Sequence, residues 1–584
     1  MTWPFLLAYM WQLPPSVVLL LLFTVALVCS CGVIALAVSR GNGWMRTAGA
    51  ATLFLGLTWL YAVVTPPFHA PDEPTHFLGL LHSIGRDAEI AEVKEWANRG
   101  HFLDLQFRPD EKFRVEWRSY YSRENLDAFF SPIDMETRAP LTAWLWRGLR
   151  PILGGCSIQW CLLLMRFFNG LLVAGGYLLA LVAVGKCSRD SIYEGSPCPP
   201  SACGPAVLLY VPVVPFFAMH VSNYPLLISA GILAGFIALS LLFLEKRPPW
   251  LGGLLGCAVF MLMFSGRGGY PFSAAVLLLV ILGEVLPRSR DNSLTEWVSP
   301  ALFWGAFALG WGVSWGFLGR LDLSVVPLSI PKIGNHLAGN RWLLISVPVA
   351  CCAAEYLFSF MRHLQLSSRS VRIIAIPGLL LFSCGILGPM WGTSHYLENI
   401  EGVSLLPTSA AYVVRVLTAF WGSQGFGTPD DFLVRYFWTG FGWLDTLFPG
   451  GVVRALALPV FFGNLMLWLR AYRTASLPLT ARLWAWFITC AAYLSALAYG
   501  ARGVPVNLHG RYLVLFYVLF LPPGFAGFFS GLSHCPWPDR VRRSRFVGVT
   551  LTRLTSPGAV WCLMIGLCTA VHCYAIWFMV NRYF

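Results

Sequence analysis

The sequence predicts an all-α integral membrane protein with about fourteen transmembrane helices. Of its 584 residues, 57% are hydrophobic and only 12% are charged, whereas about a quarter of an ordinary soluble domain is charged. The mean hydropathy is +0.64. Residues 15–38 and 557–580 contain no charged side chain, and each stretch is long enough to cross the ~30 Å hydrocarbon core of a bilayer as a helix.

Hydropathy places the predicted spans at intervals along the whole chain. They lie near residues 15–39, 47–65, 159–185, 204–221, 225–244, 249–265, 270–286, 298–318, 342–360, 373–391, 452–469, 482–500, 512–532 and 557–579. No Lys or Arg precedes Arg40, so the basic leader of a cleavable signal peptide is missing, and we expect the first apolar segment to stay as a helix.

Short basic connections recur at alternate turns, and by the positive-inside rule they are cytoplasmic. The net charge of +13 is therefore an orientation signal, and no nucleic-acid partner is expected. The connections contain Arg40 with Arg46, Lys186 with Arg189, Lys246 with Arg247, Arg288 with Arg290, Arg362 with Arg369 and Arg372, Arg470 with Arg473, and residues 539–546. Both termini and two long polar loops, residues 66–158 and 392–451, then lie on the outer side.

The first outer loop has the composition of an ordered segment. Between Asp72 and Glu136 it holds 14 of the 28 acidic residues of the chain. A disordered tether would lack aromatic residues, so we expect amphipathic helices on the membrane surface. The aromatic residues of the loop include Trp96, Trp117, Tyr120, Tyr121, Phe129 and Trp144.

The motif "HAPDEPTHF" at the start of this loop predicts a short helix. Asp72 suits the N-cap and Pro74 is tolerated in the first turn. His76 then lies one turn beyond Asp72 and Glu73, so the three side chains converge just outside the bilayer. A carboxylate beside a histidine at such a boundary suits a general base that removes a proton from a sugar hydroxyl.

Two other interpretations of this motif remain open. Asp72 can serve only as a helix cap, with Glu73 favouring the helix dipole. A metal site formed by His69, Asp72 and His76 is the second, although such spacing is common by accident.

Two arginines near outer ends of spans are candidate phosphate ligands. Arg511 follows Gly510 in "NLHGRYL", and Arg267 precedes Tyr270 in "SGRGGYPF". A guanidinium binds phosphate through paired hydrogen bonds that Lys cannot match. The alternatives are that Arg511 only anchors its span at the interface and that the glycines beside Arg267 form a tight turn.

The second outer loop has a composition that suits a carbohydrate. Aromatic faces stack on sugar C–H groups while carboxylates accept hydrogen bonds from sugar hydroxyls. The alternative is an aromatic belt at the membrane interface. The relevant residues are Asp430, Asp431, Tyr436, Trp438, Phe441, Trp443 and Asp445.

Three motifs together resemble a family of bacterial predicted membrane proteins, formerly of unknown function, that is grouped with the GT-C glycosyltransferases. They are "PPFHAPDEPTHF", "GFGWLDTLFP" and "HGRYL". The similarity covers about residues 47–532, and it implies a GT-C-like catalytic domain there. Residues 1–46 then contribute an extra span with a cytoplasmic turn, and residues 533–584 a basic cytoplasmic loop with a last span.

The resemblance also implies roles for individual residues. The matching positions are Asp72, Glu73 and His76 in the acidic motif, Arg511 and Tyr512 in the late Gly-Arg-Tyr motif, and Trp443 and Asp445 in the Gly-Trp-Leu-Asp segment. Two positions depart from the family pattern. Arg267 stands where Lys is expected, and residues 221–231 lack an expected Asp, which puts a second carboxylate contact in doubt.

The expected function is glycosyl transfer in the bacterial cytoplasmic membrane, with an active site that faces the periplasm or exterior. The donor is a sugar on a polyprenyl-phosphate carrier, and the acceptor is a glycan or lipid of the cell envelope. Asp72 acts as general base in an inverting displacement, and Arg511 with Arg267 clamps the phosphate. Glu73 orients the acceptor or holds a divalent metal, Mg or Mn; no other cofactor is expected.

Three further hypotheses remain open. A polymerase or ligase would move an oligosaccharide from a lipid diphosphate, and a non-enzymatic scaffold would tolerate loss of the acidic residues in 66–86. A flippase or transporter would contain ionisable groups deep in its spans. The candidates for such groups are Arg166, His220, Glu355 and His572. The motifs HExxH and Walker A do not occur.

Overall fold

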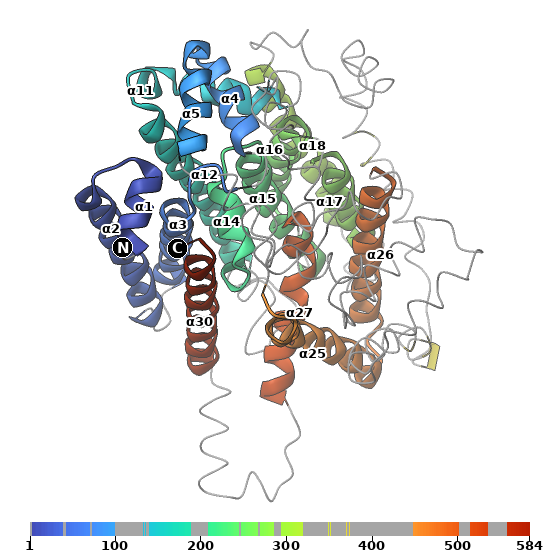
Figure 1. Ribbon diagram of the computed structural model, residues 1–584. Coiled ribbons are helices and arrows are strands. Elements are labelled where there is room, and N and C mark those ends of the chain that lie inside the picture. The colour runs from blue at the N-terminus through green and yellow to red at the C-terminus, as the bar shows by residue number, and fades with distance from the viewer. Residues whose placement is uncertain are drawn as a thin grey trace, which may run out of the picture.

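The structure, a computed structural model, describes most of the helical bundle (Figure 1). It covers residues 3–38, 43–70, 73–99, 139–187, 208–244, 247–266, 269–284, 294–318, 448–500, 514–534 and 557–583, with isolated positions 132, 135, 349, 351, 369, 370, 373 and 376. The regular elements among these residues are helices and none is a strand. The predicted all-α class is therefore confirmed for this part of the chain.

Five of the described helices are long and apolar enough to cross a membrane. They are α2 (Pro15–Val38), α3 (Gly43–Val64), α12 (Ile158–Cys187), α15 (Tyr224–Phe243) and α25 (Gly450–Thr474). Other predicted spans are occupied by α16 (Pro249–Ser265), α17 (Gly269–Glu284), α18 (Leu294–Leu318), α26 (Leu477–Gly500), α27 (Val514–His534) and α30 (Pro557–Tyr583). The predicted spans 342–360 and 373–391 fall outside the described residues except at isolated positions.

The prediction of one continuous span over 204–221 is wrong for its described part. Residues 208–210 are helical, the helix is interrupted at Val211 and Pro212, and α14 (Val213–Met219) follows. Pro212 has no N–H to donate to the carbonyl four residues back. The broken segment is buried throughout, and irregular backbone at membrane depth is tolerated where protein surrounds it.

The helices of the first outer loop gather at one end of the bundle (Figure 1), which we call the outer end. They are α4 (Glu73–Ser83), the 3-10 helix η1 (Asp87–Glu89), α5 (Ile90–Arg99), α10 (Pro140–Gly148) and α11 (Arg150–Leu153). The N-terminal helix α1 (Trp3–Trp11) and the first turns of α12 share one hydrophobic core with them. Helices are therefore confirmed in the described parts of this loop, within residues 73–99 and 139–153.

Two glycines of α15 fix its alignment with α27. A Cβ atom on Gly231 would lie 2.3 Å from Leu515 Cδ2, and one on Gly235 would lie 2.5 Å from Val518 Cγ1. Residue numbers rise together on the two helices, so α15 and α27 run parallel. The N-terminus of α15 is at the outer end, and the N-terminus of α27 therefore points toward the same end.

The C-terminal helix α30 is tied to the bundle through a buried imidazole. Tyr61 Oη lies 3.0 Å from Nδ1 of His572, and Nε2 of His572 lies 2.6 Å from the carbonyl oxygen of Leu209. Because a carbonyl can only accept, Nε2 carries the hydrogen and the Tyr61 hydroxyl donates to Nδ1. The contact joins α3 and α30 to the broken segment before α14.

We predict that Tyr61→Phe destabilises the protein. The change leaves the buried Nδ1 of His572 without its donor, which costs about 1–3 kcal/mol. The thermal unfolding midpoint of the detergent-solubilised protein measures the effect. The control is Tyr9→Phe on α1, where the side chain is 59% exposed; equal midpoints for the two variants would contradict the prediction.

Candidate functional site

Buried polar side chains concentrate at the outer end, between the loop helices and the bundle. In an apolar bundle, each of these side chains needs an internal partner. The set comprises Thr65, His69, Glu73, His76, Thr142, Arg166, Asn169, His220 and Ser222. This concentration of polarity includes part of the predicted acidic motif, and we take it as the candidate site.

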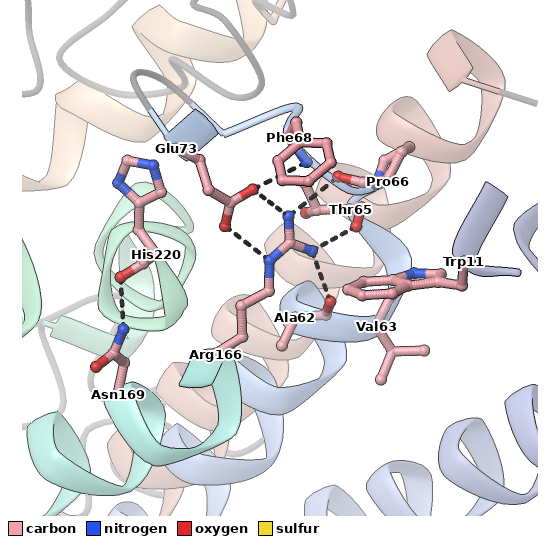
Figure 2. Close-up of polar contacts among 10 residues, drawn as sticks. All are labelled: Trp11, Ala62, Val63, Thr65, Pro66, Phe68, Glu73, Arg166, Asn169 and His220. Carbon is pink, nitrogen blue, oxygen red and sulfur yellow. Dashed lines mark hydrogen bonds and ion pairs between the residues drawn. The ribbon is translucent and has the colours of Figure 1, made fainter. Parts of the chain in front are cut away.

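At the centre of the site, Arg166 on α12 pairs with Glu73, the first residue of α4 (Figure 2). The guanidinium Nε donates to Oε1 over 2.8 Å, and Nη2 donates to Oε2 over 2.5 Å. Both side chains are 0% exposed. A bidentate pair of this kind is the strongest form of side-chain hydrogen bonding, and here it joins two elements 93 residues apart.

Arg166 also covers the C-terminal end of α3. Nη1 donates to the carbonyl oxygens of Ala62, at 2.9 Å, and Thr65, at 2.6 Å, and Nη2 donates to that of Pro66 at 3.0 Å. The last carbonyls of a helix have no partner within the helix, and the helix dipole favours a cation there. The guanidinium therefore satisfies backbone oxygens and a carboxylate at the same time.

The turn between α3 and α4 is locked onto the same carboxylate. Phe68 has a φ of 64°, which is unusual for a bulky residue, and its N–H donates to Glu73 Oε2 over 3.1 Å. The Phe68 ring packs edge-on against Trp96 of α5, with ring centroids 4.9 Å apart. The backbone at Phe68, four residues before Asp72, is thus held by a hydrogen bond and by aromatic packing.

A second set of hydrogen bonds extends from α12 to the outer ends of α14, α15 and α16. Asn169 lies one turn below Arg166, and its Nδ2 donates to the carbonyl of His220 over 2.7 Å (Figure 2). Asn223 Nδ2 donates to the carbonyl of Ser265 over 3.1 Å. Gly266 has a φ of 153°, and a Cβ there would lie 2.1 Å from Asn223 Nδ2, so glycine is required at this turn.

The connection between α4 and α5 is fixed by Arg86. Its Nε donates to Glu89 Oε1 over 2.6 Å, its Nη2 pairs with the other carboxylate oxygen, and its Nη1 donates to the carbonyl of Leu153 over 2.8 Å. The hydrogen bonds to Glu89 raise the pKa of the Arg86 guanidinium above its usual value. These contacts fasten α11 to the helices that carry the site.

The structure describes only part of the set predicted from the sequence. Glu73 and His76 are buried on α4, and the predicted start of a helix at the acidic motif is confirmed because α4 begins at Glu73. Tyr270 lies in the first turn of α17, and its side chain is not described. The remaining predicted site residues lie outside the described residues: Asp72, Arg267, Trp443, Asp445, Arg511 and Tyr512.

The expected roles of Glu73, orienting the acceptor or holding a metal, stay hypotheses. Its described contacts are with Arg166 and Phe68, and these use three of about four lone-pair positions on the carboxylate. The metal hypothesis for His69, Asp72 and His76 depends on a residue outside the described part. Within the described part, no three His, Cys, Asp or Glu side chains are grouped to hold a metal ion.

Sequence reasoning missed Arg166 as a member of the site and treated it only as an ionisable group in a span. A signal was present, because an arginine inside a transmembrane helix faces the protein interior and needs a partner. Glu73 at the start of the first outer loop was a candidate for that partner. Charge alone did not single it out, because the same loop holds 14 acidic residues between Asp72 and Glu136.

We predict that Glu73→Gln destabilises the protein by about 3–5 kcal/mol, because it leaves a buried guanidinium uncompensated. The control is Asp87→Asn, because the Asp87 side chain and its partner His82 are both more than half exposed; exposed pairs contribute about 0–1 kcal/mol. Thermal midpoints in detergent compare the two variants. Similar small shifts for both would contradict the central role of the Glu73–Arg166 pair.

The comparisons with known proteins leave the function to be argued from the residues. No protein family model, no curated protein and no solved structure matches the chain. The resemblance to the GT-C glycosyltransferases therefore rests on the sequence motifs alone.

Proposed function

We propose that the protein is a GT-C-type membrane glycosyltransferase, with a GT-C-like bundle of about fourteen transmembrane helices. It transfers a sugar from a polyprenyl-phosphate carrier to a glycan or lipid acceptor of the cell envelope. Its site faces the outer side of a bacterial cytoplasmic membrane. One observation carries the proposal. The described residues nearest in the chain to Asp72, Arg267 and Arg511 lie at, or on helix ends directed toward, the outer end of the bundle.

Chain connectivity links Asp72 and Arg267 to described atoms. Consecutive Cα atoms are 3.8 Å apart, so Asp72 directly adjoins Glu73 and Arg267 directly adjoins Gly266. Glu73 is held by Arg166. Gly266 lies against Asn223 in the turn before α15, and that turn is in contact with α12 through Asn169. This supports a common outer location for the acid and the first arginine.

Arg511 is three residues before Val514, the first residue of α27. Three residues reach at most about 11 Å. Because α27 runs parallel to α15, its N-terminus points toward the outer end. Aromatic contacts support the same arrangement: Tyr493 of α26 packs against Phe272 near the start of α17 and against Phe516 near the start of α27, with centroid distances of 5.4 and 6.4 Å.

In the proposed mechanism, Asp72 removes the proton from the acceptor hydroxyl as the hydroxyl oxygen attacks the anomeric carbon. The bond from that carbon to the phosphate oxygen breaks, and the electron pair leaves with the polyprenyl phosphate. Arg511 and Arg267 stabilise the negative charge that develops on the phosphate. One base and one leaving-group clamp fit a single inverting displacement.

The other residues have supporting roles in this proposal. Glu73, fixed by Arg166, positions the backbone beside Asp72. Its further role in this proposal is to orient the acceptor or to hold a divalent metal. His76 lies in the first turn of α4, and in this proposal its ring hydrogen-bonds the reacting groups. Contacts to the donor and its sugar come from Tyr270, Trp443, Asp445 and Tyr512.

The contacts of the buried ionisable groups bear on the transporter hypothesis. A relay through the membrane needs groups that change partners. Arg166 is held by a carboxylate and three carbonyl oxygens, and both ring nitrogens of His572 have partners. These fixed contacts favour structural roles for both side chains and count against a transport relay through them.

We predict that Asp72→Asn lowers the rate of sugar transfer by about 10²- to 10⁴-fold, the usual contribution of a general base. The assay uses purified protein in vesicles supplied with a polyprenyl-phosphate sugar. The control is Asp87→Asn, whose exposed carboxylate contacts only the His82 ring among described side chains. Near-normal transfer by a folded Asp72→Asn variant would remove Asp72 from catalysis.

We predict that Arg511→Ala weakens donor binding, because the phosphate loses a bidentate partner. Arg511→Lys should restore it only in part, since an ammonium cannot reproduce the fork of donors. The measurement is the KM for the polyprenyl-phosphate sugar, with direct binding of the donor as a check. Donor affinity equal to that of the unaltered protein in both variants would contradict the phosphate clamp.

A further inference from the structure

The N-terminal helix α1 reaches the centre of the candidate site, although the sequence suggests that residues 1–46 are additional to the catalytic domain. Its last residue, Trp11, is buried, and the indole Nε1 donates to the carbonyl of Val63 over 3.0 Å. The Arg166 guanidinium carbon lies 5.0 Å from the centre of the indole ring. Figure 2 shows the indole beside the carbonyls that Arg166 binds.

Trp11 and Arg166 bind neighbouring carbonyl oxygens at the end of α3. Arg166 takes the carbonyl oxygens of Ala62, Thr65 and Pro66, and Trp11 takes that of Val63, which lies between them. The ring also presents its face to the guanidinium, an arrangement that attracts the cation and keeps water from it. The orientation of the guanidinium toward Glu73 therefore depends on the indole as well as on the carboxylate.

The position of α1 is fixed by contacts on several sides. The helix ends at Trp11. The next residue, Gln12, has a φ of 51°, and Leu13 N–H donates back to the carbonyl of Ala8 over 3.1 Å. The side chain of Gln159 on α12 donates to that of Gln12. Trp96 Nε1 on α5 donates to the carbonyl of Met10 over 3.1 Å, and the Trp96 ring packs against Phe68 in the turn before Asp72.

We propose that α1 is a functional part of the site and that Trp11 is a positioning residue for the turn that carries Asp72. The indole acts through Arg166 and Glu73, and Trp96 provides a second connection from α1 through Phe68. Loss of the indole then loosens the Asp72 turn without removing any group that touches substrate. The expected fall in transfer rate rests on the proposed glycosyl transfer, whereas the expected loosening of the Asp72 turn does not.

Two substitutions and one control test the proposal. Trp11→Ala removes both the ring and the donor, and Trp11→Phe keeps a ring face while it removes the donor to Val63. Tyr9→Ala is the matched control, because Tyr9 lies on the same helix and is 59% exposed. A first measurement is independent of any enzymatic activity. In an Asp72→Cys background, a membrane-impermeant maleimide labels position 72, and mass spectrometry of the corresponding peptide gives the labelling rate.

We expect Trp11→Ala to raise the labelling rate at position 72 several-fold, Trp11→Phe to raise it less, and Tyr9→Ala to leave it unchanged. In the native Asp72 background, the kcat for sugar transfer should fall by about 10- to 100-fold in Trp11→Ala, since small misplacements of a catalytic group have effects of this size. The donor KM should stay near that of the control.

The outcomes separate this inference from the proposed function. Labelling rates that are the same in Trp11→Phe, Trp11→Ala and Tyr9→Ala would overturn the positioning role of α1, whatever the activity. A fall in kcat matched by an equal rise in donor KM would also overturn it, because that pattern indicates a role in donor binding. Absence of transfer in the unaltered protein would instead remove the proposed function, and the labelling result would still decide the role of Trp11.

Discussion

The ion pair between Glu73 and Arg166 is the constraint on which the outer end depends. Two charges with no exposure to solvent are tolerated only when each is paired and the remaining hydrogen-bonding positions are filled. Here the carboxylate accepts from the guanidinium and from Phe68 N–H. The guanidinium in turn donates to three carbonyls at the end of α3. Removal of one member would therefore leave several groups unsatisfied.

This network explains how a short polar motif can be held against an apolar bundle. The contacts of the network come from α1, α3, α4, α5 and α12, so helices that begin as far apart in the chain as Trp3 and Ile158 meet around this ion pair. A second buried arginine, Arg247, also binds a carbonyl near the end of a helix. Arg247 is buried, donates to the carbonyl of Val280 near the end of α17 over 2.6 Å, and lies over the ring of Phe303. In both cases a guanidinium satisfies carbonyls at a helix C-terminus.

Much of the helical bundle could be predicted from hydropathy, since uninterrupted apolar stretches can satisfy their backbone groups only as helices. The predicted span 249–265 coincides with α16, and 225–244 differs from α15 by one residue at each end. The break before α14 was missed because averaging over a long window hides the backbone effect of a single proline. Pro212 and Pro215 were the available signal.

The candidate site was harder to predict than the helices. The acidic motif and its helix start were visible locally, through the N-cap preference of Asp72 and the position of Pro74. The partner of Glu73 could not be identified in this way, because the two members of the pair are 93 residues apart and a single sequence carries no record of that contact. The part played by Trp11 depends on tertiary packing alone, since a tryptophan near a membrane boundary is commonly an interfacial anchor.

The proposed mechanism requires Asp72 and Arg511 to lie at the same end of the bundle. Spin labels on cysteines at positions 72 and 511, with pulsed electron resonance, measure their separation directly. The reference pair is 72 and 534, because His534 ends α27, and a 21-residue helix is about 30 Å long. We predict that the 72–511 distance is shorter than the 72–534 distance by a large part of that length. A 72–511 distance equal to or longer than the reference would contradict it.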